Sequence, residues 1–244
     1  MATISENIQQ LRARMGLACE QASRPVHSVT LLVVTKTFPA EDVRAAFLAG
    51  ETRFGENYVQ EGLDKIAALA DLRSQIEWHM IGPLQSNKTR PVAEQFDWVH
   101  SVDRLKIAQR LSDQRPAHLP PLQLCLQVNI SGESTKSGLM PDEVLEVARA
   151  VAALPRVQLR GLMAIPEPAE SLASQREPHH ALARLLQQLQ GQGLALDTLS
   201  MGMSGDLEAA ILEGSTIVRV GSAIFGQRQR PAPSASGDSA PSLS

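Results

Sequence analysis

The sequence has no long apolar segment and no secretory start. No run of eighteen apolar residues occurs in the 244 residues, and the N-terminus lacks a basic stretch followed by an apolar core. The first absence argues against a membrane-spanning helix, and the second argues against a signal peptide. We therefore expect a cytoplasmic protein that makes no membrane contact.

Clustered positive charge and metal-ligand spacings are also missing. The formal net charge is -3 with a pI of about 6.1, and no basic run occurs, which argues against a nucleic-acid partner. Two cysteines, Cys19 and Cys125, suit a reducing compartment and predict free thiols and no metal site. Small neutral or phosphorylated ligands are the better candidates.

The apolar content, 43% of the residues, is sufficient for one sizeable core and fits a single α/β domain. Strand-like segments alternate with helical patterns and lie at about 29–35, 52–56, 76–81, 98–102, 122–130, 157–165, 198–201 and 216–220. This alternation predicts a (β/α)8 TIM barrel over residues 1–229. The alternative is an open doubly wound sheet, whose usual glycine-rich turn after the first strand is missing.

Three further segments complete the predicted organisation. An amphipathic helix over residues 5–22, with Ser5 as its cap, precedes the first strand. A helix from about His179 to Gln190 follows the sixth strand. Residues 230–244 are rich in Pro, Ser and Ala without apolar periodicity, which predicts a disordered tail.

A lysine stands at the end of the first predicted strand. There Lys36 would be held by the sheet while facing the loops that carry function in an α/β barrel. Partial desolvation by Leu32 and Val34 would lower its pKa, and the deprotonated amine is the form that attacks an aldehyde to give a Schiff base. Because most lysines at strand ends are simply solvated, this position alone does not establish a covalent role.

Serine and glycine residues follow the last two predicted strands, at Ser204, Gly205, Gly221 and Ser222. In barrels of this type the loops after these strands often bind a phosphate. Glycines let backbone N–H groups approach an anion, and hydroxyls donate hydrogen bonds to it. Each residue alone is more typical of a helix cap or a turn, but together, facing Lys36, they predict a phosphate site.

An arginine interrupts the apolar last strand. Arg219 is flanked by valines, so we expect its guanidinium to be buried and paired or hydrogen-bonded. It pairs with Glu56 inside the barrel, or it donates to a ring nitrogen of a bound cofactor. A lysine that forms an imine, an arginine at a ring nitrogen and a phosphate site together describe a pyridoxal phosphate site. The same lysine and phosphate site would also suit a Schiff-base aldolase acting on a phosphosugar.

Several longer motifs make the sequence recognisable, and they lie at residues 34–36, 54–57, 78–88, 128–130, 136–138, 161–163, 199–204 and 218–226. Through them the chain closely resembles the YggS/PROSC family of pyridoxal phosphate homeostasis proteins, which share the barrel of alanine racemase. The resemblance implies that Lys36 forms the internal aldimine and that Arg219 faces the pyridine nitrogen. The other cofactor-binding residues that it implies are Asn57, Ser204, Gly221 and Ser222.

The resemblance leaves the choice between a carrier and an enzyme to the residues. An arginine at the pyridine nitrogen makes the cofactor a weaker electron sink. Alanine racemase takes a second base, a tyrosine, from another domain, whereas this chain ends after the barrel and has only Tyr58. His79 in mid-strand is more typical of a core histidine, and Lys136 of a solvated loop, although Lys136 could bind or relay the incoming cofactor.

We therefore expect a monomeric protein that holds pyridoxal 5'-phosphate on Lys36 and takes part in vitamin B6 homeostasis. It has no dedicated catalytic residues in this interpretation, and its partners are the cofactor and apo-enzymes that receive it. The alternative is a low-activity amino-acid racemase that depends on the same cofactor.

Overall fold

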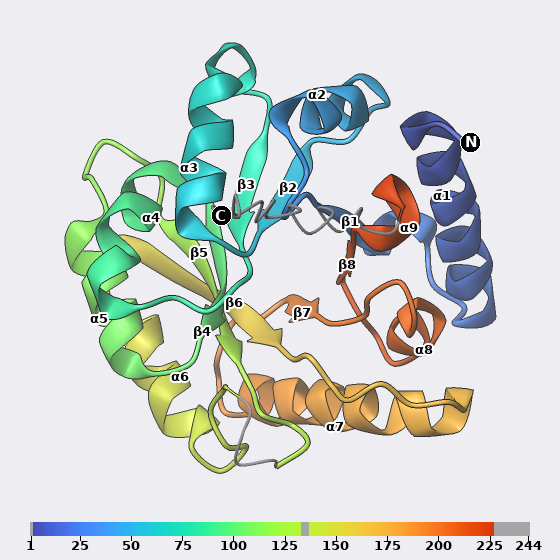
Figure 1. Cartoon of the computed structure of the whole chain (residues 1–244). Coiled ribbons are helices and arrows are strands. Elements are labelled where there is room, and N and C mark those ends of the chain that lie inside the picture. Colours follow the sequence, from blue (N-terminus) through green and yellow to red (C-terminus); the bar gives the residue numbers. More distant parts are fainter. Residues whose placement is uncertain (1, 133–136, 227–244) are drawn as a thin grey trace, which may run out of the picture.

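Eight parallel strands close into a barrel in the computed structural model, which describes residues 2–132 and 137–226 (Figure 1). The strands are β1 Thr30–Val34, β2 Arg53–Glu56, β3 Glu77–Met80, β4 Trp98–Val102, β5 Leu122–Gln127, β6 Val157–Met163, β7 Thr198–Ser200 and β8 Ile217–Val220. The pairing runs in sequence order and closes between β8 and β1, where Thr30 lies opposite Ile217. The predicted (β/α)8 barrel is confirmed, and the open sheet is excluded.

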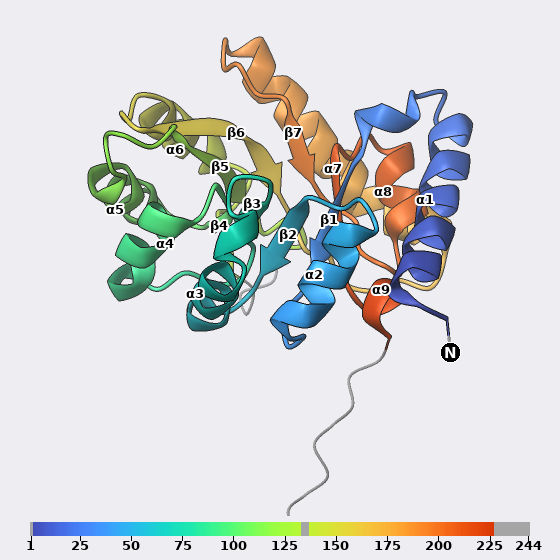
Figure 2. The ribbon, with the colours of Figure 1, turned by 90° about the horizontal axis from the view of Figure 1, so that it is seen from above.

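Helices surround the barrel on its outer side (Figure 1). They are α1 Ile4–Gln21, α2 Ala40–Leu48, α3 Val59–Ala68, α4 Thr89–Gln95, α5 Leu105–Gln114, α6 Val144–Ala152, α7 Leu172–Gly191, α8 Leu207–Leu212 and α9 Ser222–Phe225. The extra helix α1 lies against α8 and α9, the helices directly before and after β8 in the sequence (Figure 2). No helix in residues 2–132 and 137–226 is long and apolar enough to cross a membrane.

The start of α1 differs from the prediction. Its cap is Thr3 and not Ser5, because Thr3 has a glutamate three residues later. The Thr3 hydroxyl accepts from the backbone N–H of Glu6, while the Glu6 carboxylate accepts from the backbone N–H of Thr3. This reciprocal arrangement satisfies two N–H groups at once, which a cap at Ser5 would not do.

The helix α7 begins earlier than predicted, at Leu172, and contains Pro178. Its cap is Ser171, whose hydroxyl accepts from the backbone N–H of Ser174. Proline lacks an N–H and therefore costs the helix one internal hydrogen bond. Side chains buried further along α7, such as Leu182 and Leu186, hold the helix against the barrel in spite of this cost.

The core has two layers, because successive residues of a strand point to opposite faces of the sheet. One buried cluster lies inside the barrel and consists of Leu32, Val34, Ile81, Trp98, Cys125, Met163 and Ile217. A larger cluster lies between the strands and the helices, and Cys19 of α1 belongs to it. Both cysteines are buried free thiols, as predicted, and burial raises the pKa of Cys125 to about 12.

Two expectations concern residues that the structure does not describe. The predicted tail, residues 230–244, and the loop lysine Lys136 both lie outside the described residues.

Candidate functional site

The loops after six of the strands surround a cavity of about 640 Å³ at the C-terminal end of the barrel, here called the lysine cavity. Its lining residues are Val34, Lys36, Phe38, Asn57, Ile81, Ile165, Met203, Ser204, Arg219, Gly221, Ser222 and Gly226. All six residues predicted to bind the cofactor are among them. Parallel strands bring these residues together because their C-terminal ends meet at one face of a barrel.

Lys36 lies half-buried in a turn directly after β1. The next residue, Thr37, has a φ of 68°, a left-handed conformation that is unusual and strained for a β-branched side chain. The backbone N–H of Thr37 donates to the carboxylate of Glu61 on α3. The strained turn is therefore anchored immediately beside the lysine.

A buried ionic group, which we call the Lys65 cluster, supports this turn and consists of Glu56, Glu61 and Lys65. The Lys65 ammonium donates to the backbone carbonyl of Thr35 at 2.6 Å and to both carboxylates at 2.7 Å. Burial raises the pKa of the Glu56 carboxyl, against the attraction of Lys65. The Oε2 atom of Glu56 is buried and has no hydrogen-bond partner within residues 2–132 and 137–226.

The Lys65 cluster was not predicted from the sequence. The i,i+4 spacing of Glu61 and Lys65 was the available signal, because such a pair lies on one face of a helix. That spacing is common on solvated helix faces, so it does not by itself distinguish a buried pair.

Arg219 is buried, as predicted, but it does not pair with Glu56. Its guanidinium donates to Ser200 Oγ at 2.7 Å and to the backbone carbonyl of Ala164 at 2.9 Å. Burial lowers the pKa of Arg219 to about 10, against the attraction of Asp206. The side chain therefore stays cationic at neutral pH, and Glu56 is occupied by Lys65 instead.

The hydroxyls predicted to bind phosphate lie next to each other, with Ser204 Oγ 3.1 Å from Ser222 Oγ. Gly221 precedes α9, and a Cβ atom at this position would lie 2.6 Å from the backbone oxygen of Val34. A glycine is therefore required for the end of β8 to approach the end of β1. That approach brings Ser222 to the same rim as Lys36.

His79, a conceivable second base, and Tyr58, the single tyrosine of the sequence, both lie outside the lysine cavity. His79 is 1% exposed, and its ring nitrogens lie 2.9 Å from His100 Nε2 and 3.0 Å from Glu77 Oε1. It is a hydrogen-bonded core histidine, as predicted. Tyr58 is 59% exposed and does not line the lysine cavity. In the described part of the chain, no three His, Cys, Asp or Glu side chains are grouped so that they could hold a metal ion.

Comparison with known sequences gives a family match over nearly the whole chain. Residues 1–229 match the family described as alanine racemase, N-terminal domain. A pyridoxal phosphate homeostasis protein of Pseudomonas aeruginosa is 60% identical over 233 residues, which are 96% of this chain and 99% of the relative. A protein of the same name from Escherichia coli is 52% identical over 229 residues, 93% of this chain and 98% of the relative.

Solved structures show the same architecture. PipY of Synechococcus elongatus, with PLP bound, is 37% identical with a TM-score of 0.80, covering 92% of this chain and all (100%) of PipY. Alanine racemase of Corynebacterium glutamicum has a TM-score of 0.64 at 17% identity, covering 93% of this chain and 62% of the racemase. The second likeness concerns the fold alone.

Proposed function

The chain belongs to the alanine racemase N-terminal-domain family and, within it, to the pyridoxal phosphate homeostasis proteins; from this membership we propose that it binds pyridoxal 5'-phosphate in the lysine cavity. One observation carries the proposal. The six residues that the motifs single out line a single cavity whose described lining has two basic side chains, Lys36 and Arg219, and no carboxylate. Such a cavity favours an anionic ligand.

The residues present fit this cofactor. When bound, pyridoxal 5'-phosphate supplies an aldehyde that reacts with a primary amine and a ring that withdraws electrons. Lys36 would provide the amine that condenses with the aldehyde, whose oxygen leaves as water, and the hydroxyls of Ser204 and Ser222 would donate to the phosphate. Val34 and Ile81 offer apolar surface to the ring.

Two residues define the surroundings of the ring in this proposal. Asn57 lines the cavity from the end of β2 and lies beside the ring. Arg219 keeps its protons at neutral pH, so its N–H groups donate to a ring nitrogen that must remain unprotonated. Gly221 permits the close approach of the phosphate-binding segment to β1.

We further propose that the protein stores and delivers the cofactor and has no dedicated catalytic residues. The described lining of the lysine cavity contains no histidine and no tyrosine that could act as a second base opposite Lys36. An arginine at the ring nitrogen also disfavours carbanion chemistry. In this proposal the protein acts in the cytoplasm as a monomer and passes the cofactor to apo-enzymes.

The test is the visible absorption of the purified protein with pyridoxal 5'-phosphate, before and after borohydride reduction, followed by peptide mass mapping. We expect an absorption band that reduction removes and a pyridoxyl mass on the peptide containing Lys36. Lys36→Ala should abolish both, whereas Lys106→Ala, which changes an exposed lysine of α5, should abolish neither. A reducible adduct that persists in Lys36→Ala would place the covalent bond elsewhere.

A second measurement addresses the absence of catalysis. The loaded protein should not racemise amino acids above the rate of the free cofactor. Turnover that disappears in Lys36→Ala would instead identify the protein as a low-activity racemase.

A further inference from the structure

A continuous line of hydrogen bonds crosses the barrel interior and reaches the lysine cavity. Arg219 Nη1 lies 2.7 Å from Ser200 Oγ, and that oxygen lies 2.7 Å from His100 Nδ1. His100 Nε2 lies 2.9 Å from His79 Nδ1, and His79 Nε2 lies 3.0 Å from Glu77 Oε1. We call these five residues the histidine chain, and they come from β8, β7, β4 and β3.

The donors and acceptors of the histidine chain can be ordered in one direction. Burial opposes ionisation of Glu77, but the hydrogen bond from His79 and the charge of Arg53 outweigh it and hold the pKa of this carboxyl below its usual value, so the carboxylate only accepts. Burial lowers the pKa of His79 and of His100, so both imidazoles are neutral at pH 7. His79 Nε2 must then donate to Glu77, which leaves His79 Nδ1 to accept from His100 Nε2.

The same order follows at the other end. A neutral His100 that donates through Nε2 has an accepting Nδ1, which accepts a hydrogen bond from the hydroxyl of Ser200. The oxygen of Ser200 is then left to accept from Arg219. Every hydrogen bond in the chain points from the arginine toward the carboxylate, with a cation at one end and an anion at the other.

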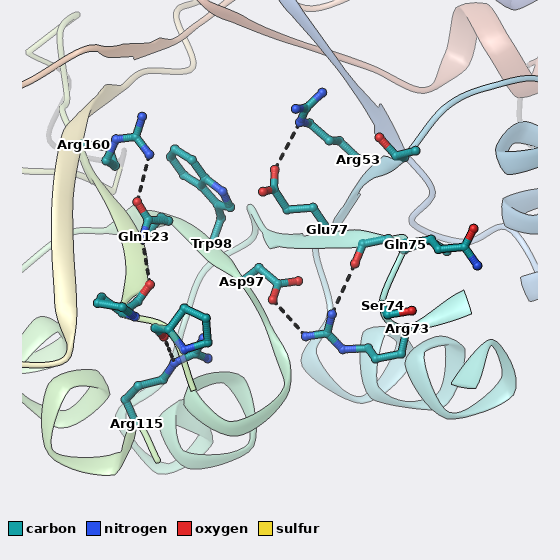
Figure 3. A pocket seen from close by; sticks show the side chains of 14 residues that line it. Arg53, Arg73, Ser74, Gln75, Glu77, Asp97, Trp98, Arg115, Gln123 and Arg160 are labelled. Atoms are coloured by element: carbon teal, nitrogen blue, oxygen red, sulfur yellow. Dashed lines mark hydrogen bonds and ion pairs between the residues drawn. The ribbon is translucent and has the colours of Figure 1, made fainter. Parts of the chain in front are cut away.

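The carboxylate end opens at the opposite mouth of the barrel, in a cavity of about 560 Å³ (Figure 3). Arg53 donates to Glu77 there at 3.2 Å, and Trp98 lies in the same lining. The Trp98 ring stacks on His79 with a centroid separation of 5.3 Å. Trp98 thus covers the imidazole of His79, while the Glu77 side chain remains 40% exposed.

We propose that Ser200, His100 and His79 are positioning residues for Arg219, which they hold in one orientation toward the ligand of the lysine cavity. A serine hydroxyl can rotate, and a rotamer that aimed its proton at the guanidinium would oppose a donor with a donor. Because the Ser200 hydroxyl donates its hydrogen bond to His100, only the oxygen lone pairs of Ser200 face Arg219. The negative end at Glu77 aligns the intervening dipoles in the same sense.

This inference rests on the proposed function for the identity of the ligand, whereas the hydrogen-bond order can be tested without any ligand. Nitrogen-15 NMR of the histidine rings distinguishes the two neutral tautomers and the charged form. In the ligand-free protein at pH 7 we expect His79 and His100 both to be neutral with the proton on Nε2. A charged ring, or a proton on Nδ1 of either residue, overturns the proposed order and with it the positioning role.

The positioning role is tested with variants titrated with pyridoxal 5'-phosphate and followed by visible absorption. Ser200→Ala removes the acceptor of Arg219 and should raise the Kd about fivefold, the size expected for one hydrogen bond, and shift the absorption maximum. The matched control is Ser112→Ala, which deletes another buried hydroxyl, bonded to the backbone of Pro155, and should leave both unchanged.

A pair of substitutions at His79 tests action at a distance, because His79 does not line the lysine cavity. His79→Leu breaks the chain and should shift the spectrum in the same direction as Ser200→Ala, with a rise in Kd of about twofold to threefold. His79→Gln keeps an accepting oxygen and a donating amide, and should restore the wild-type spectrum.

The outcomes separate the two proposals. If the wild-type protein develops no absorption band with pyridoxal 5'-phosphate, the proposed function fails, and positioning toward that ligand fails with it. If the band develops but His79→Leu and Ser200→Ala match the wild type, only the positioning role is wrong. If these variants do not fold, the nitrogen-15 spectrum of the wild-type protein decides, because a charged ring or a proton on Nδ1 of His79 or His100 overturns the role by itself.

Discussion

The turn that carries Lys36 and the guanidinium of Arg219 belong to one cavity, but they are held by different means. The Lys65 cluster holds the turn with full charges, an ammonium between two carboxylates at 2.7 Å. The histidine chain holds Arg219 through neutral groups, and its nearest carboxylate along the chain, Glu77, is four hydrogen bonds away.

The difference lies in what each region can tolerate. Removing one charge from a buried ionic group leaves its partner desolvated and unpaired, which costs more than the pair itself contributes. The neutral middle of the histidine chain, Ser200, His100 and His79, has no such charge to expose, but it fails when a proton is added, because a charged imidazole cannot accept. The first region should therefore be sensitive to charge removal, and the second to acid.

The largest effect is expected from Lys65→Met. This change leaves the fully buried carboxylate of Glu56 without its cation and should lower the free energy of unfolding by about 3–5 kcal/mol, measured by urea denaturation at pH 8. The exposed Lys106→Met should change it by less than about 0.5 kcal/mol. A loss as small as that of the control would mean that the Lys65 cluster does not depend on its charges.

The pH dependence of the destabilisation in Lys65→Met tests whether the ionised carboxylate of Glu56 is its cause. Burial raises the folded-state pKa of Glu56, so its ionised form disfavours folding, and this cost appears as the pH rises through that pKa. Without Lys65 the cost grows. The destabilisation of Lys65→Met should therefore shrink as the pH is lowered, and a destabilisation that stays constant down to pH 4.5 would contradict it.

The histidine chain should respond to acid in the opposite direction, with an intermediate effect. The folded-state pKa values of His79 and His100 are lowered from 6.5, so their contribution is complete above pH 6.5 and is lost as the pH falls below it. Each imidazole should cost at most about 1.4 kcal/mol per pH unit, the limiting slope for one proton, between pH 6.5 and its folded-state pKa.

Urea denaturation between pH 7.5 and pH 4.5 measures this slope. The double variant His79→Gln/His100→Gln should flatten it, while His118→Gln, at an exposed position, should preserve it. A double variant with the full wild-type slope would show that other groups titrate there.

The smallest effect is expected at the outer end of the histidine chain. Arg53 and Glu77 form an ion pair in which both side chains are almost half exposed. Arg53→Gln should therefore change the free energy of unfolding by less than about 1 kcal/mol, because water and salt screen such pairs. A change of several kcal/mol would mean that the carboxylate end of the chain is effectively buried.

The fold and the positions of the predicted site residues followed from local sequence. Alternating strands and helices specify a barrel, and residues just after parallel strands meet at one face, so Lys36, Ser204 and Ser222 could be predicted to lie together. Helix starts were harder, since Thr3 and Ser5 are both good caps and only the glutamate at Glu6 decides between them.

The supporting side chains could not be predicted in the same way. Glu56 was a plausible partner for Arg219, and its pairing with Lys65 depends on where α3 packs against β2. The histidine chain joins residues as far apart as 77 and 219, and no spacing in the sequence brings His100 next to Ser200. Such contacts are set by the closure of the barrel and not by any periodicity.

Closure between β8 and β1 also has a consequence for synthesis. The partner of Thr30 in β1 is Ile217 in β8, so one edge of the first strand has no neighbour until almost the entire barrel sequence has left the ribosome. At about 5–20 residues per second this interval is roughly 10 to 40 seconds. An apolar strand with an open edge is a template for mispairing, so β1 is exposed to wrong strand partners throughout this interval.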